Sequence, residues 1–148
     1  MVDSCELTIF DGLENLPHFN PDIVETAPTV QYFKQQLLAA DGVIICTPEY
    51  AHGVPGSLKN AIDWTVGTGE FSGKPTVLIT ASTDGQFAHT ALLETLRVIE
   101  ARNVEQLNLL IQFIKTKVNA QHQIIHQPTL AAIEQLLHHF MQTIHQPV

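Results

Sequence analysis

The chain has 148 residues, of which 45% are hydrophobic and 15% are charged, and this is enough apolar material for the core of one domain over residues 1–148. A formal net charge of -8 argues against nucleic acid and anionic membrane surfaces as partners, because no basic cluster could replace phosphate counterions. No apolar run approaches the roughly 20 residues of a membrane span, and the first residues lack the order of a signal peptide. We therefore expect a cytoplasmic protein.

The elements in the first half of the chain alternate between strand and helix. Residues 6–10 (ELTIF) show the partial alternation of a half-exposed edge strand, and residues 13–28, with three prolines, resemble a surface loop. Apolar residues at helical spacing predict a helix over residues 28–40. The β-branched run VIIC at residues 43–46 predicts a strand buried on both faces, and Pro55 predicts the start of the next helix.

The second half repeats this alternation. It predicts a second buried strand at residues 76–81, a helix from Ala88 to about Ala101, a strand at residues 104–111 and a last helix from Pro128. The segment between the last strand and Gln127 has no clear pattern. Four strands joined by helical crossovers indicate an α/β fold with a mainly parallel sheet.

Cysteine and histidine patterns give no support to a metal or dithiol site. Cys5 and Cys46 are far apart, and Cys46 lies in the predicted buried strand, where a thiol behaves as a small hydrophobe. His122 and His126 are four residues apart but have no neighbouring third ligand. We expect both cysteines to be structural and no metal to be bound.

Two loops follow the predicted buried strands at their carboxyl ends. The first, residues 48–53, is PEYAHG, and the second, residues 82–86, is STDGQ. In open α/β sheets, such loops border the crevice in which ligands bind. Position alone makes them the candidate site.

The sequence TPEYAHGVPGSLKNAIDW at residues 47–64, followed by GKPTVLITAS at residues 73–82, resembles the hallmark of the NADPH-dependent FMN reductases. This flavodoxin-like family includes quinone, chromate and azo-dye reductases. The resemblance implies a three-layer flavodoxin-like sandwich, bound FMN, NAD(P)H as electron donor, a quinone, flavin or similar small acceptor, and a homodimer or homotetramer. One local departure is Ala51, where the family commonly has Asn.

The resemblance also implies which residues contact the flavin ring, and it requires no catalytic acid or base, since the cofactor carries the hydride. Tyr50 and His52 could instead pack against their own loop, and Glu49 could accept hydrogen bonds from the ring or from the following helix. Four further hallmark residues lie within the predicted helix, where we expect them to anchor the helix and contact another subunit: Lys59, Asn60, Asp63 and Trp64. The implied cofactor-binding residues are Pro48, Glu49, Tyr50, Ala51, His52, Gly53, Ser82, Thr83, Asp84 and Gly85.

One part of the family pattern is missing. If residues 6–10 correspond to the second family strand, the first strand, its phosphate-binding loop and the helix after it have no counterpart in the sequence. Either residues 6–10 pair directly with residues 43–47 or the chain is incomplete. We therefore expect weak FMN binding by this chain and strong binding by an N-terminally extended form. The alternative hypothesis is a truncated domain without cofactor that serves as a fragment or interaction module.

Overall fold

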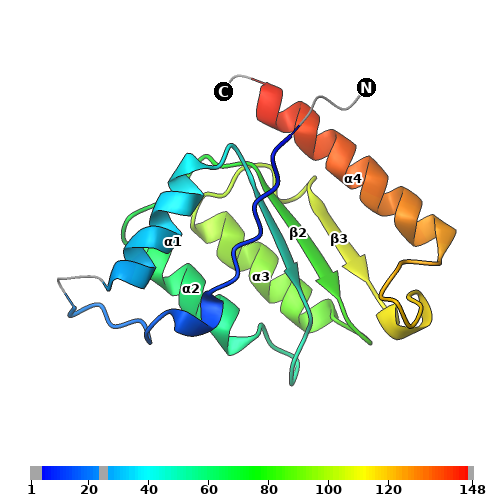
Figure 1. Ribbon diagram of the computed structural model, residues 1–148, viewed down its shortest axis with the longest axis horizontal. Helices are drawn as coiled ribbons and strands as arrows, with labels where there is room; N and C mark the ends of the chain where they lie inside the picture. The colour runs from blue at the N-terminus through cyan, green and yellow to red at the C-terminus, as the bar shows by residue number, and fades with distance from the viewer. Residues whose placement is uncertain (1–4, 24–26, 147–148) are drawn as a thin grey trace.

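The structure, a computed structural model, describes residues 5–23 and 27–146 as a three-layer α/β arrangement (Figure 1). Its three strands form one parallel sheet in the order β1-β2-β3. This confirms the predicted α/β class and parallel sheet. In the described residues, no helix is both long enough and apolar enough to span a membrane. The elements are η1 (Leu13–Asn15), α1 (Pro28–Ala39), β1 (Val43–Thr47), α2 (Gly56–Val66), β2 (Thr76–Ala81), α3 (Gln86–Val98), β3 (Asn108–Ile111), η2 (Ile114–Thr116) and α4 (Gln127–His145).

Helices cover the two faces of the sheet unequally (Figure 1). Helices α1, α2 and α3 pack on one face, where Ile45 of β1 and Leu78 of β2 belong to the larger core. Helix α4 covers the other face, where Val77 and Ile79 of β2 meet Phe140. Neighbouring residues of β2 thus enter opposite cores, as the alternation of side chains in a strand requires.

Strand β1 is covered on one face only, which corrects the prediction that it is buried on both. Ile44 is 38% exposed and Cys46 is exposed, while Ile45 between them is 7% exposed. The physical reason is that the smaller core formed with α4 includes residues of β2 and β3 but none of β1. Cys46 is therefore a surface residue, although partial burial of its thiol raises the pKa of that group.

The predicted edge strand at residues 6–10 is wrong. These residues are extended but belong to no strand, and Leu7 and Ile9 are 71% and 80% exposed. Strand β1 pairs only with β2 in the described part of the chain. Only Phe10 is held, because its ring lies 5.0 Å from that of Phe33 on α1. An alternating pattern was present, but no strand supplied the hydrogen-bonding partner that a ladder needs.

The last strand begins later than predicted. Asn103 adopts a left-handed φ of 63°, and its carbonyl accepts bonds from Gln106 and Leu107, so residues 104–107 form turns. Val104 and Leu107 are nevertheless buried, which explains why their apolar pattern resembles a strand. The four predicted α-helices are all confirmed, with ends within a few residues of those expected.

Helix α2 anchors the long loop that precedes α1. The side chains of Asn60 and Trp64 both donate hydrogen bonds to the carbonyl of Pro17, at 3.0 and 2.8 Å. Asn60 also accepts a bond from the Phe19 N–H at 2.8 Å, and the Phe19 ring packs edge-on against Trp64. The expected anchoring role of these two hallmark residues is therefore confirmed, and the anchored element is the loop between η1 and α1.

Candidate active site

The two candidate loops lie side by side at the carboxyl edge of the sheet, where the strand arrows end in Figure 1. Thr47, the last residue of β1, pairs with Thr80 of β2, so the chain leaves both strands at the same level. The Glu49 carboxylate then joins the loops, accepting hydrogen bonds from the N–H groups of Gly85 at 3.3 Å and Ala88 at 2.7 Å. Glu49 thus caps α3, the helix after the second loop, and not the helix that follows its own loop.

The first loop is a tight turn that presents aromatic side chains. Tyr50 and Gly53 exchange two backbone hydrogen bonds of 3.0 and 2.8 Å, and the residues between them, Ala51 and His52, both have left-handed φ values of 47° and 57°. The His52 ring stacks on Phe87 of α3 with centroids 4.3 Å apart. Tyr50 is 67% exposed, so it does not pack within its own loop. Pro48 is half-buried at the base of the turn.

The second loop is shaped around Gly85. Its φ of 85° is left-handed, and a Cβ at this position would lie 2.9 Å from Leu110 Cδ1 and 3.2 Å from Thr80 Cγ2. Only glycine fits both constraints. Ser82 is half-buried, and Thr83 and Asp84 are exposed.

A third loop, residues 112–113 between β3 and η2, was not assigned to the site by the sequence analysis and meets the second loop. Gln112 and Phe113 directly follow β3, and the Gln112 amide donates a bond to Asp84 Oδ1 at 2.9 Å. The N–H of Phe113 bonds to the Thr83 carbonyl at 3.0 Å. The sequence could have indicated this loop too, because it follows the carboxyl end of a predicted parallel strand, as the other two loops do.

A buried histidine connects the elements beneath these loops. His89 of α3 is 7% exposed, and its Nδ1 lies 2.8 Å from Thr80 Oγ1 while its Nε2 lies 3.0 Å from Asn108 Oδ1. The Asn108 amide nitrogen donates to two backbone carbonyls, so its oxygen is the acceptor and His89 Nε2 carries the proton. The network ties α3 to β2 just before the second loop, through Thr80, and to the first residue of β3, Asn108.

This arrangement can support a planar ring. In the first turn of α3, the N–H groups of Gln86 and Phe87 have no partner among the described residues, and they are available to oxygen atoms of a ligand. The ring of FMN fits such a set of backbone donors and exposed aromatic groups. The three loops contain no Lys or Arg that could bind the phosphate. Across residues 5–23 and 27–146, no three His, Cys, Asp or Glu side chains gather into a metal site.

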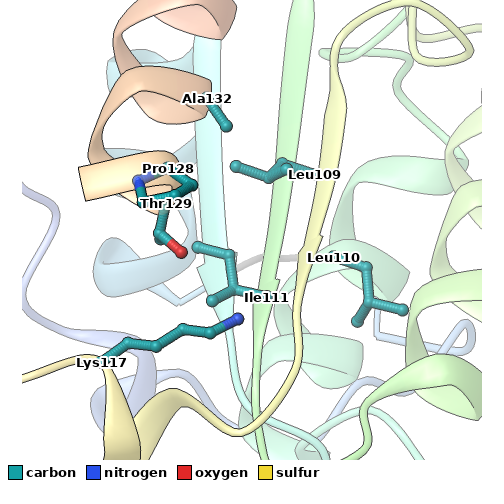
Figure 2. Close-up of a pocket in the computed structure, with 7 residues that line it drawn as sticks. All are labelled: Leu109, Leu110, Ile111, Lys117, Pro128, Thr129 and Ala132. Atoms are coloured by element: carbon teal, nitrogen blue, oxygen red, sulfur yellow. The ribbon is translucent and has the colours of Figure 1, made fainter. Parts of the chain in front are cut away.

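A cavity of about 140 Å³ lies elsewhere, between β3 and α4 (Figure 2). Leu109 and Ile111 point towards α4 there, while Leu110 points to the other side of the strand. Lys117 is the one charged residue in its lining. No residue of the first two loops lines it, so it is separate from the site described above.

Comparisons with known proteins agree with this geometry. Residues 1–116 match the family described as NADPH-dependent FMN reductase. The chain is 32% identical over 142 residues to an NAD(P)H-dependent FMN reductase of Pseudomonas aeruginosa, covering 90% of this chain and 75% of that protein. It is 32% identical over 136 residues to a quinone reductase of Escherichia coli, covering 86% and 72%.

Solved structures give the same picture. FerB, a flavoenzyme NAD(P)H:acceptor oxidoreductase from Paracoccus denitrificans, superposes with a TM-score of 0.72 at 25% identity, covering 89% of this chain and 76% of that one. Sequence family and fold agree over most of the molecule. The chain belongs to the NADPH-dependent FMN reductase family.

Proposed function

We propose that this chain catalyses NAD(P)H-dependent reduction of a quinone, a flavin or a similar small acceptor, with FMN as the cofactor. The single observation that carries the proposal is the Glu49 bridge, which joins the loop after β1 to the loop after β2 at the carboxyl edge of the sheet. Similarity to a quinone reductase and to an FMN reductase supports this choice of acceptors.

The proposed ring contacts are the two loops of the sequence hallmark, residues 48–53 and 82–85. Backbone N–H groups there and at the start of α3 would bind the ring oxygens and stabilise negative charge on the reduced ring. Tyr50, which is exposed at the outer side of its turn, would cover a ring edge. Gly85 lets the second loop pack closely against Leu110 and Thr80, which fixes the position of its backbone N–H groups.

When bound, FMN would supply the redox chemistry between NAD(P)H and the acceptor. The residues of the two loops would hold and orient the ring. No side chain of the two loops is assigned as a general acid or base. Donor and acceptor would use the same exposed ring face in turn, which predicts ping-pong kinetics.

The test is a titration of the chain with FMN and with riboflavin, which lacks the phosphate, followed by quenching of flavin fluorescence. We expect both to bind with affinities within about threefold, because the ring loops provide no cationic side chain and one charged hydrogen bond would change affinity by tenfold or more. Added FMN should then support NADPH oxidation with a benzoquinone. A colourless chain that neither binds flavin nor oxidises NADPH would favour the alternative, a non-catalytic interaction module.

We also propose a single domain over residues 1–148, a homodimer or homotetramer, and a cytoplasmic location. The shared core between α1, α2, α3 and the sheet supports one folding unit. A single cooperative unfolding transition would support the domain proposal, and two transitions would contradict it. Sedimentation equilibrium would determine the oligomeric state, and fractionation of cells producing the chain would determine its location.

A further inference from the structure

Phe113 combines a strained backbone with an exposed aromatic ring. Its φ of 53° is left-handed, a conformation that bulky side chains rarely adopt, and its side chain is 60% exposed. Neither feature contributes to the core, because Phe113 belongs to neither cluster of buried residues. Strain and exposure together at one position point to a role in binding.

The backbone around Phe113 is fixed relative to the second loop by three hydrogen bonds. Phe113 N–H donates to the Thr83 carbonyl at 3.0 Å and Ile114 N–H donates to the Ser82 carbonyl at 3.1 Å. The Gln112 side chain adds the 2.9 Å bond to Asp84. Phe113 is thus held beside the loop that is proposed to contact the flavin.

The order of the strands determines which side of the second loop Phe113 occupies. Because β2 lies between β1 and β3, the stacked pair of His52 and Phe87 borders the second loop on the β1 side, and Phe113 borders it on the β3 side. Aromatic groups therefore flank the second loop from both neighbouring strands. Aromatic faces bind planar rings by stacking, without need of a particular hydrogen-bond pattern.

We propose that the Phe113 ring contacts a planar aromatic ligand bound over the loop of residues 82–85. The ligand is either the isoalloxazine ring of the cofactor or an aromatic acceptor such as a quinone. The inference rests on the proposed function and adds a contact residue from a loop outside the sequence hallmark. It also explains why a left-handed position holds Phe in place of Gly.

The test compares Phe113→Gly, which removes the ring and relieves the backbone, with Phe113→Tyr, which keeps the ring. The matched control is His122→Gly, since His122 has a similar φ of 60° and is exposed in a turn outside the three loops. We would measure the melting temperature, the Kd for lumiflavin by fluorescence quenching, and the KM for a benzoquinone and for ferricyanide in the FMN-supplied NADPH assay.

We expect Phe113→Gly to melt no lower than the unchanged chain and to bind its ligand about tenfold more weakly, the usual size of losing one stacking partner. A raised Kd for lumiflavin identifies the cofactor ring as the ligand. A raised KM for benzoquinone alone, with ferricyanide unchanged, identifies the acceptor. Phe113→Tyr and His122→Gly should stay within twofold.

The inference is overturned if Phe113→Gly leaves both constants unchanged, weakens benzoquinone and ferricyanide equally, or alters only the sedimentation of the chain. In each of these outcomes the unchanged chain still binds lumiflavin and oxidises NADPH. Failure of the proposed function is distinguishable, because then the unchanged chain itself would neither bind lumiflavin nor oxidise NADPH, and both conclusions would fall.

Discussion

The two faces of the sheet differ in how far their helices reach. Three helices cover β1 and β2 on one face, and Ile45 and Leu78 are both buried there. On the other face α4 covers β2 and β3, and its core includes no residue of β1, although Phe140 lies close to Gly42, the residue before β1. Ile44 and Cys46 remain exposed as a result.

This difference shows that the first candidate loop, residues 48–53, is attached to a strand that is packed on one face only. Strand β1, which carries that loop, has one neighbouring strand and one covered face, whereas β2 has two of each. The Glu49 bridge and the stacking of His52 on Phe87 therefore account for much of what fixes the first loop against the second. Four predictions test this comparison.

The largest expected effect separates two adjacent isoleucines of β1. Ile45→Ala removes a side chain that is 7% exposed and should lower the free energy of unfolding by about 2–5 kcal/mol. Ile44→Ala removes the same atoms from the open face, where the side chain is 38% exposed, and should cost about 1–1.5 kcal/mol. Urea denaturation of both variants measures the difference. Equal losses would mean that the second face of β1 is covered in solution.

The next effect concerns how closely α4 approaches β1. An added Cβ at Gly42 would lie 2.5 Å from Phe140 Cζ and 3.0 Å from Ile144 Cδ1, and Phe140 is buried. Gly42→Ala should therefore lower the free energy of unfolding by about 1–3 kcal/mol through overpacking. The control is Gly56→Ala, because nothing lies within 4 Å of a Cβ at Gly56, and alanine favours the helix there. Similar stabilities for the two variants would contradict close packing of α4.

The sequence predicted the helices and strands whose apolar residues recur at regular spacing. The spacing of Val30, Phe33 and Leu37 predicted α1, and the run from Val43 to Thr47 predicted β1. The resemblance also selected the loop containing Glu49, which lies where expected.

What the sequence could not supply was the partner of each segment. Residues 6–10 have the apolar alternation of a strand but pair with no other strand. Cys46 lies in an apolar strand whose second face is not covered by a helix. His89 occurs among the apolar residues of α3, and its hydrogen bonds depend on Asn108, which is 19 residues away. Phe113 begins a segment without periodicity, so its role emerges only from tertiary contacts.

A smaller effect is expected at the bridge between the loops. Glu49→Ala removes the acceptor for Gly85 and Ala88 at the start of α3 and should cost about 0.5–2 kcal/mol, as for loss of a helix cap. The first loop should also become less ordered, weakening lumiflavin binding several-fold. Asp63→Ala is the control, since it removes a carboxylate from an exposed pair with Lys59 and should cost less than about 0.5 kcal/mol. Glu49 has no bridging role if both variants bind lumiflavin equally.

The smallest effect probes the open face without disturbing the fold. In a Cys5→Ser variant, Cys46 should react with a thiol reagent in the native protein, because its side chain is exposed. The reaction should be slow at neutral pH, since partial burial raises the pKa of this thiol and the thiolate is the reactive form. The rate should therefore rise about tenfold per pH unit through and beyond the range in which an ordinary cysteine levels off. Reaction only after unfolding would show that another surface covers β1, and a rate that levels off early would show that the thiol is not desolvated.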